Sequence, residues 1–447
     1  MTRAVRVQIG NRSPPLACCE LTPSPAVAGS GTRVTGERNR ATGENEGVWN
    51  PALPNSLESV QIVYKVAERC NINCTYCYYF NMGDNTPLER PARASLATTE
   101  RIGTWLAQGC ETLSIPRVHI AFHGGEPFLI GMKRFDEMCA ILRDRVLPIA
   151  DIEFSVQTNG TIFNEEWLAV MRENQVSIGV SIDGDRNAHD RYRLDRHGRS
   201  TFEKTEATIK ALVQSAEGDP TLLPTTISVL DHRVDYVEAY SYLRSLGVET
   251  MSFLLPDRNA DDVEFRTSGL AAQYGHRLME IFESWLREDN PMIRVRFIDE
   301  TLRHFKIGLE PGPVTRRRKD VQVLIARSDG TIAVDDSYIP ALTWYSAAPV
   351  YSVDEASLPQ VLADPIYALI EKEIRTLPAR CQACRWQVMC RGGDLENRFS
   401  ERNGFDNPSI YCDAYMHFYG EVCELLERNG YPRDEIERRF PRLTEAV

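Results

Sequence analysis

The sequence has no continuous run of about 18 apolar residues, the length that a membrane-spanning helix requires. Its N-terminal region also has no apolar segment typical of a signal peptide. Positive charge is scarce, because 51 Lys and Arg residues stand against 63 Asp and Glu residues, and the net charge is −12. These absences exclude a transmembrane helix and disfavour a general binder of nucleic acid or anionic membranes. We therefore expect a cytoplasmic protein with neither a nucleic-acid nor a membrane partner.

Regular patterning is missing from the first part of the chain. Residues 1–55 are poor in aromatic residues and rich in Ser, Thr, Arg, Gly and Pro. A segment of this composition cannot bury an apolar core, so we predict a disordered N-terminal tail. Cys18 and Cys19 lie in this tail, and we interpret them as incidental thiols.

Strand and helix patterns alternate over residues 56–290, a segment of the 447-residue chain that suits one large domain. The apolar stretches that are typical of buried strands are 60–66, 118–122, 152–157, 176–182, 224–230 and 248–255. The helical patterns are 99–113, 132–147, 164–174, 202–214, 234–246 and 269–286. Such alternation predicts an α/β fold with a parallel sheet and right-handed crossovers. Six units are too few for a closed eight-stranded barrel, so we expect a partial (β/α)6 TIM barrel.

The alternation ends near residue 290, and two further regions follow. In the bridging region, 291–375, the stretches 321–325 and 331–334 flank a Gly turn and predict a hairpin. The C-terminal region, 376–447, is rich in cysteine and contains a helical pattern from about 412 to 428. Seven of the 12 cysteines fall in two tight groups, which indicates metal binding rather than disulfides in a chain without a signal peptide.

The first cysteine group directly follows the first predicted strand. Cys70, Cys74 and Cys77 are spaced C-x3-C-x2-C, and the next cysteine is Cys110. Thiolates are soft ligands that suit zinc and iron–sulfur clusters, but a structural zinc site needs a fourth ligand. A four-iron cluster held by three cysteines would leave one iron open for a substrate or cofactor. We therefore favour an iron–sulfur site over zinc.

Residues 70–77, Cys-Asn-Ile-Asn-Cys-Thr-Tyr-Cys, resemble the signature of the radical S-adenosylmethionine (SAM) superfamily. The resemblance implies a [4Fe-4S] cluster whose open iron binds SAM. Reductive cleavage of SAM would then give a 5′-deoxyadenosyl radical that abstracts a hydrogen atom from the substrate. Tyr76 holds the position where the family packs the adenine.

Further matches to this superfamily follow in order at successive strand ends. They are the GGEP segment at 124–127, QTNG at 157–160, SIDG at 181–184 and HDRYR at 189–193. The resemblance implies that these regions and the first cysteine group hold the cofactor. The implied cofactor-binding residues are Tyr76, Gly124, Gly125, Glu126, Pro127, Gln157, Asn159, Ser181 and Arg193.

The second cysteine group lies in the C-terminal region. Its members are Cys381, Cys384, Cys390 and Cys412. Four thiolates complete a cluster or a zinc site with no open position, and spacing alone favours neither. The context resembles the SPASM extension of peptide-modifying radical enzymes, in which such a set binds an auxiliary [4Fe-4S] cluster. The implied cofactors are thus SAM and two [4Fe-4S] clusters.

The resemblance to a full SPASM domain breaks where that domain binds a second auxiliary cluster. The predicted hairpin has no cysteine, Asp335 stands at the position of a cluster ligand, and Asp394 replaces the second cysteine of a CxxxC pair. We therefore expect one auxiliary cluster. In related maturases the next hairpin residue is an Asp that acts as a base, which makes Asp336 and its neighbour Asp335 candidate catalytic residues. The alternative is that both Asp side chains end a hairpin in solvent.

Residues 78–84, after the first cysteine group, resemble those of maturases that form cyclophane crosslinks. The implied reaction joins an aromatic ring carbon to a side-chain β-carbon of a ribosomally made precursor peptide. Electrons would come from a donor such as flavodoxin or ferredoxin. Two alternatives remain open: a sulfatase-type or thioether-forming radical SAM maturase, and, from another class, a non-catalytic zinc-binding interaction protein.

Overall fold

The computed structural model describes residues 57–306 and 321–441. The predicted N-terminal tail, with Cys18 and Cys19, lies outside the described residues. Among the residues that are described, no helix is both long enough and apolar enough to cross a membrane.

A single curved sheet forms the framework, with the strand order β10-β9-β8-β1-β2-β3-β4-β5-β6-β7. Neighbouring strands from β1 to β7 are parallel. Their bounds are β1 (Ser59–Ala67), β2 (Arg117–Gly124), β3 (Asp151–Thr158), β4 (Val176–Ser181), β5 (Thr225–Val229), β6 (Thr250–Leu254) and β7 (Arg294–Val295). The six predicted strands and the partial-barrel fold are therefore confirmed, and the short β7 extends the sheet by one further parallel strand.

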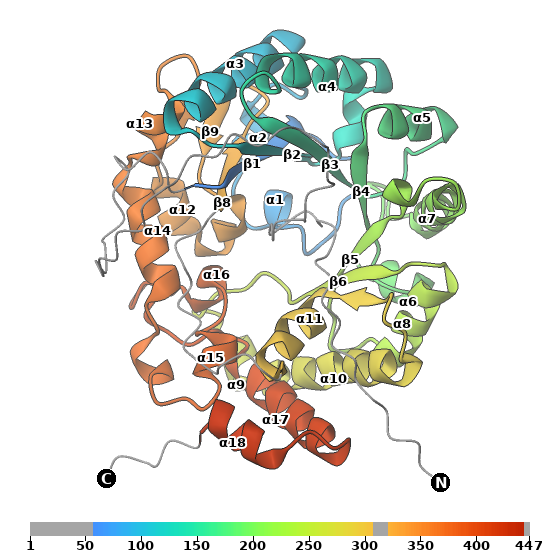
Figure 1. The fold of residues 1–447 in the computed structure, drawn as a ribbon, viewed down its shortest axis with the longest axis vertical. Coiled ribbons are helices and arrows are strands. Elements are labelled where there is room, and N and C mark those ends of the chain that lie inside the picture. The colour runs from blue at the N-terminus through green and yellow to red at the C-terminus, as the bar shows by residue number, and fades with distance from the viewer. Residues whose placement is uncertain (1–56, 307–320, 442–447) are drawn as a thin grey trace, which may run out of the picture.

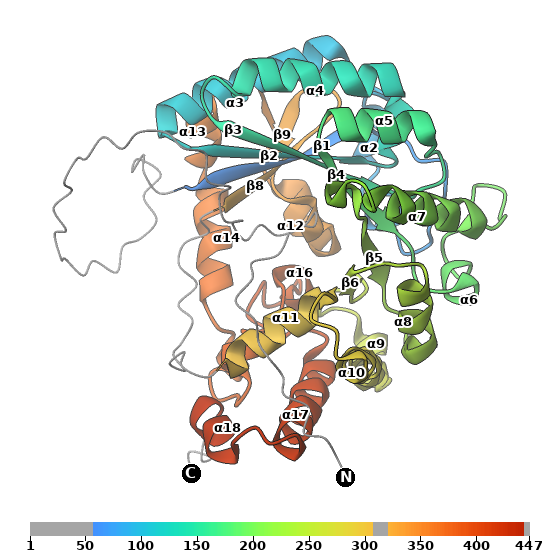
Figure 2. The same ribbon diagram turned by 45° about the vertical axis from the view of Figure 1, so that its right-hand side comes forward.

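Helices cover the outer, convex face of this sheet (Figures 1 and 2). The long ones are α3 (Leu96–Leu113), α4 (Met132–Val146), α5 (Glu165–Glu173), α7 (Phe202–Ala216), α8 (Tyr236–Ser245) and α10 (Leu270–Glu288). The chain also has shorter helices that are not all on this face: α1 (Tyr78–Asn81), α2 (Thr86–Glu89), α6 (Arg186–His189), α9 (Val263–Thr267) and α11 (Arg296–Leu302). Of these, α1 lies on the inner side of the curved sheet (Figure 1). Side chains cap several helix starts: Ser95, Asn164 and Asp235 each accept a backbone N–H of the first turn.

Side-chain alternation gives the sheet two different faces. On β1, the Tyr64 hydroxyl lies 3.0 Å from the Thr99 hydroxyl of α3, so Tyr64 points toward the helices. Successive side chains of a strand point to opposite faces, and Lys65 therefore points into the barrel. The same alternation on β2 directs Phe122 toward Phe135 of α4 and places His123 beside Lys65 inside the barrel. The barrel interior consequently has polar side chains that the helices do not cover.

The predicted hairpin is present and continues the barrel sheet. Strand β8 (Val321–Ala326) pairs in parallel with β1, and β9 (Thr331–Ala333) and β10 (Tyr351–Ser352) add two antiparallel strands. Gly330 makes the turn with a φ of +91°, a conformation that favours glycine. After β9 the chain turns through a 3-10 helix, η4 (Asp336–Ala341), into the barrel interior. This arrangement brings Asp336 next to β1.

The C-terminal region lies against the side of the barrel opposite α3 and α4 (Figures 1 and 2). Its helices, with those of the bridging region, are α12 (Leu342–Ala347), α13 (Leu358–Leu362), α14 (Pro365–Arg375), α15 (Gln387–Cys390), α16 (Leu395–Arg398), α17 (Cys412–Arg428) and α18 (Arg433–Arg439). Helix α17 packs on α10, for example through Phe282 and Phe418, whose ring centres are 6.0 Å apart. The predicted helix from 412 to 428 is confirmed.

Candidate active site

The loop after β1 holds the first cysteine group at the carboxyl edge of the parallel sheet, where barrel folds place their active sites. Cys70, Cys74 and Cys77 carry free thiols, and each one adjoins at least one of the others. Burial raises the pKa of Cys70 to about 12, with a contribution from the nearby Glu126 carboxylate, and raises the pKa of Cys74 to about 11. Thiols in such a site become thiolates when a metal centre supplies positive charge.

Two glycines let the end of β2 approach this loop closely. A Cβ atom on Gly124 would lie 2.1 Å from the Ala67 carbonyl oxygen, and one on Gly125 would lie 2.3 Å from that of Arg69. Gly125 and Glu126 donate backbone hydrogen bonds of 2.8 and 3.0 Å to these same oxygens. The GGEP segment is therefore docked on the cysteine loop, and only glycine fits at its first two positions.

The Glu126 carboxylate is fully buried, and it accepts hydrogen bonds from other residues of this chain. It accepts hydrogen bonds from Phe128 N at 3.1 Å, from the Thr158 hydroxyl at 2.7 Å and from Asn159 N at 2.8 Å. Burial raises its pKa to about 7, and these hydrogen bonds act in the opposite direction. Glu126 thus ties the end of β2 to the end of β3 and places the Asn159 amide 3.8 Å from the sulfur of Cys70.

A second set of contacts joins the cysteine loop to the end of β4. The Tyr76 hydroxyl donates to Asp183 Oδ2 at 2.7 Å and accepts from the Arg193 guanidinium at 2.8 Å. The Gln157 side chain donates to the Ser181 hydroxyl at 2.8 Å. The structure therefore brings the predicted cofactor-binding residues together at the carboxyl ends of β1 to β4. Asp183 was not among the predicted site residues, although its position before a glycine at a strand end was a usable signal.

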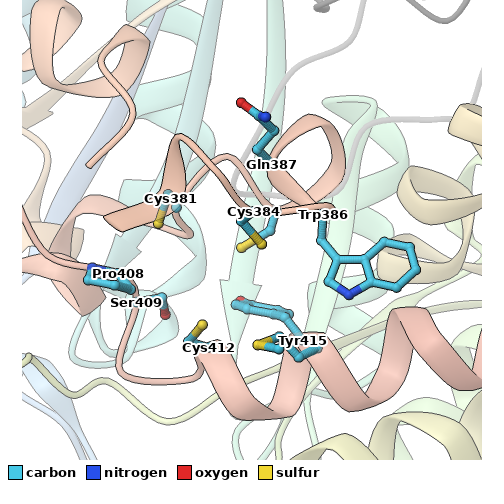
Figure 3. A pocket seen from close by; sticks show the side chains of 11 residues that line it. Cys381, Cys384, Trp386, Gln387, Pro408, Ser409, Cys412 and Tyr415 are labelled. Carbon is cyan, nitrogen blue, oxygen red and sulfur yellow. The ribbon is translucent and has the colours of Figure 1, made fainter. Parts of the chain in front are cut away.

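The second cysteine group surrounds one pocket. Cys381, Cys384, Cys390 and Cys412 line it together with the rings of Trp386 and Tyr415 and several other side chains. In Figure 3 the sulfurs of Cys381, Cys384 and Cys412 lie around the same space. Burial and the neighbouring thiols raise the pKa of Cys412 to about 11. The structure thus assembles all four cysteines that the spacing had grouped.

Both cysteine groups fit an iron–sulfur cluster. Thiolates are soft ligands that suit such clusters. Three cysteines hold a four-iron cluster with one iron open, and four cysteines leave no open position. The donor chemistry of the two groups is therefore consistent with one cluster of each kind.

The two candidate catalytic aspartates lie in different environments. Asp336 is buried, and its Oδ2 atom lies 2.5 Å from the Lys65 ammonium, with side-chain exposures of 5% and 0% for the two residues. Asp335 is half-buried and caps the next turn by accepting a hydrogen bond from Ser337 N at 3.0 Å. The interpretation of both side chains as solvent-exposed hairpin ends is thus wrong for Asp336, because η4 folds it into the barrel. Lys65 was not a predicted site residue.

Further carboxylates gather near Asp336 from separate parts of the chain. Burial raises the pKa of Asp257 to about 7, and the negative charges of Asp336 and Asp394 add to this effect. Burial also raises the pKa of Glu396, with contributions from Asp394, Asp257 and Asp335. The two positions where the sequence departs from the SPASM pattern, Asp335 and Asp394, therefore belong to one acidic group. Asp257 and Glu396 were not predicted because no local motif contains them.

Comparisons with known proteins agree with this geometry. Residues 64–228 match the model of the Radical SAM superfamily. A cysteine-type anaerobic sulfatase-maturating enzyme of Clostridium novyi is 24% identical over 368 residues, which cover 81% of this chain and 95% of the relative. A serine-type anaerobic sulfatase-maturating enzyme of Bacteroides thetaiotaomicron is 24% identical over 385 residues, which cover 82% and 90%.

Solved structures share the fold at low sequence identity. Native anSMEcpe with bound AdoMet superposes with a TM-score of 0.67 at 19% identity and covers 84% of this chain and 100% of its own. Streptococcus suis SuiB bound to the precursor peptide SuiA gives a TM-score of 0.54 at 15% identity and covers 80% and 76%. Residues 64–228 thus form a radical SAM domain, and the fold and the cysteine loop agree with a radical SAM enzyme that uses SAM and [4Fe-4S] clusters. These findings disfavour the alternative of a non-catalytic zinc-binding protein.

Proposed function

We propose that this enzyme modifies a ribosomally made precursor peptide by joining an aromatic ring carbon to a side-chain β-carbon. The observation that carries the proposal is the buried Asp336 carboxylate, which η4 places inside the barrel against β1, near the cysteine loop. A crosslink of this kind requires a proton acceptor beside the reacting carbon atoms. Asp336 supplies one on the inner side of the barrel, beside Lys65 of β1.

Peptide modification is supported by the relatives and the structural neighbours. The relatives are sulfatase-maturating enzymes, and the neighbours include anSMEcpe bound to a peptide and SuiB bound to its precursor peptide. These proteins share the barrel and the C-terminal region with this chain over most of its length. The same architecture in this enzyme suits a peptide substrate.

The chain's own residues account for the steps around the radical chemistry. When bound at Cys70, Cys74 and Cys77, the cluster and SAM supply a radical that removes one hydrogen atom from a substrate β-carbon. That carbon then bonds to the aromatic ring, and the ring adduct must lose one proton and one electron to become aromatic again. Asp336 takes the proton. The site formed by Cys381, Cys384, Cys390 and Cys412 would hold the cluster suited to accept the electron.

Sulfatase-type oxidation of Ser or Cys is the second candidate, because the sequence relatives carry that name. Two residues of this chain favour a different product. Asp335 and Asp394 occupy positions where a full SPASM domain has cluster ligands, so we expect one auxiliary cluster here. The electron path of a two-cluster maturase would then be absent, which favours the crosslinking reaction.

The test is anaerobic reaction of the reconstituted enzyme with candidate precursor peptides, beginning with any short peptide that is encoded beside the enzyme's gene. Crosslinking removes two hydrogens and blocks peptide fragmentation between the joined residues. Oxidation of Ser to an aldehyde also removes two hydrogens, but its product reacts with a hydrazine reagent. We expect a hydrazine-unreactive product with a protected segment in tandem mass spectrometry. A hydrazone-forming product would instead establish the sulfatase-type reaction.

A further inference from the structure

We infer that Lys65 is a positioning residue that keeps the Asp336 carboxylate ionised and oriented for proton transfer. This inference rests on the proposed function, in which Asp336 accepts the proton of the ring adduct. It assigns a role to a residue of β1 that belongs to neither cysteine group and to none of the cofactor-binding motifs.

The Lys65 side chain connects the cysteine loop to the hairpin. Its ammonium lies 2.5 Å from Asp336 Oδ2 and 3.2 Å from the hydroxyl of Tyr78, the residue after Cys77. It also lies 4.5 Å from the centre of the Tyr79 ring, a cation–π contact. Lys65 therefore holds Asp336 in a fixed relation to the helix that follows the first cysteine group.

Asp336 is the only negatively charged side chain in direct contact with this ammonium among the described residues. The third polar contact, 3.4 Å away, is Nδ1 of His123. Burial and the Lys65 charge lower the pKa of His123 to about 3, so its ring is neutral. Arg327 adds positive charge near Asp336 without an ion-pair contact, and its guanidinium donates to the Tyr345 hydroxyl at 2.6 Å.

The carboxylates near Asp336 explain why this aspartate needs a cation in contact with it. A buried carboxylate without a partner favours its neutral form, and nearby negative charges favour it further. Asp257, which lies in the same acidic group, has its pKa raised to about 7 by these two effects. A protonated carboxyl group cannot accept another proton. The Lys65 ammonium therefore favours the ionised form of the carboxylate that it contacts, Asp336.

The first experiment compares Lys65→Met with Lys210→Met. Lys210 makes an exposed ion pair with Glu206 on α7, 3.0 Å long, so the control removes the same charge away from the site. For Lys65→Met we expect wild-type iron content and continued formation of 5′-deoxyadenosine, with crosslinked product reduced by about 10²–10⁴-fold. Lys65→Arg should recover part of the product, and Lys210→Met should match wild type. A wild-type ratio of product to 5′-deoxyadenosine in Lys65→Met would overturn the inference.

A second measurement separates the inference from a folding defect. The double variant Lys65→Met/Asp336→Asn has no unpaired buried charge and should form no less product than Asp336→Asn alone, because both changes act on one proton transfer. A further loss that multiplies the two single effects would show that Lys65 acts independently of Asp336. Infrared difference spectra of the cofactor-free proteins give a readout without turnover. Lys65→Met should gain a protonated carboxyl band that the double variant lacks, and its absence would refute the inference.

The outcomes also distinguish this inference from the proposed function. If wild type crosslinks the peptide and Lys65→Met keeps the wild-type ratio, the inference fails and the function stands. If wild type gives a hydrazone-forming product, and Asp336→Asn forms as much of it, the proposed function fails. In that case the carboxyl band of Lys65→Met still reports whether Lys65 keeps Asp336 ionised.

Discussion

The two cysteine groups differ in what surrounds them. Cys70, Cys74 and Cys77 follow a buried strand, and the ends of β2, β3 and β4 reach their loop through the hydrogen bonds of Gly125, Asn159 and Tyr76. The other four cysteines lie on short helices, on a turn and at the start of the long helix α17, and they surround a pocket whose lining includes aromatic side chains. The first group thus adjoins the predicted cofactor-binding motifs, whereas the second consists of four cysteines around one pocket.

Because of this difference, we expect substitutions in the two regions to stop different steps of the reaction. Changes on the barrel side should stop radical generation and, with it, every later step. Changes on the C-terminal side or at the hairpin should leave radical generation in place and stop the completion of the product. The ratio of product to 5′-deoxyadenosine therefore tells which region a residue serves.

The largest effect is expected from the first group. Replacing Cys70, Cys74 and Cys77 together by Ala should abolish SAM cleavage, because the cluster that binds SAM would lose its protein ligands. Anaerobic incubation with a reductant and chromatographic detection of 5′-deoxyadenosine measure this loss. A triple variant that still makes 5′-deoxyadenosine would contradict the assignment of this group.

Substitutions in the second cysteine group should stop product formation without stopping SAM cleavage. Wild type should contain about eight iron atoms per chain, and replacing Cys381 and Cys384 by Ala should leave about four. This variant should still cleave SAM but lose the crosslinked peptide. About twelve iron atoms in wild type would contradict the expectation of one auxiliary cluster, and about four would contradict a cluster in the second group.

The sequence predicted the barrel well because its signals are local. Each parallel strand is a short apolar stretch, and each cofactor motif is a few residues at one strand end, so both are visible within a short window. The ligand spacing of both cysteine groups is local for the same reason. Strand β8 was predicted only as part of a hairpin, because its parallel pairing with β1 joins segments that are far apart in the sequence.

The contacts around Asp336 could not be predicted in the same way. Lys65 looks like an ordinary residue of a buried strand, and only the insertion of η4 into the barrel gives it an acidic partner. Asp257 and Glu396 join the acidic group from the segment after β6 and from α16. Such a group depends on how the hairpin and the C-terminal region pack against the barrel, and no spacing in the sequence records that packing.

Asp336→Asn tests whether the hairpin, like the second cysteine group, is needed for product formation but not for SAM cleavage. The variant should still cleave SAM, yet form about 10²–10⁴-fold less crosslinked peptide, because Asn cannot accept the proton. It leaves the Lys65 ammonium buried without its partner, which is expected to cost about 3–5 kcal/mol of folding free energy. Thermal unfolding and iron content therefore accompany the assay. Equal product from wild type and a folded Asp336→Asn would remove this residue from the mechanism.

The smallest effect is expected one residue earlier, at Asp335. Its side chain caps the turn that leads into η4 by accepting the backbone N–H of Ser337, and Asn is an equally good capping residue. Asp335→Asn should therefore change the free energy of unfolding by no more than about 0.5 kcal/mol. The substitution removes a charge but keeps the cap, the hairpin and the Lys65–Asp336 contact. If Asp336 is the base, product formation should stay close to wild type, which makes Asp335→Asn the matched control for Asp336→Asn. A loss of product as large as that of Asp336→Asn would instead mean that the aspartates act as a pair, and that proton transfer depends on the charge of the acidic group rather than on one carboxylate.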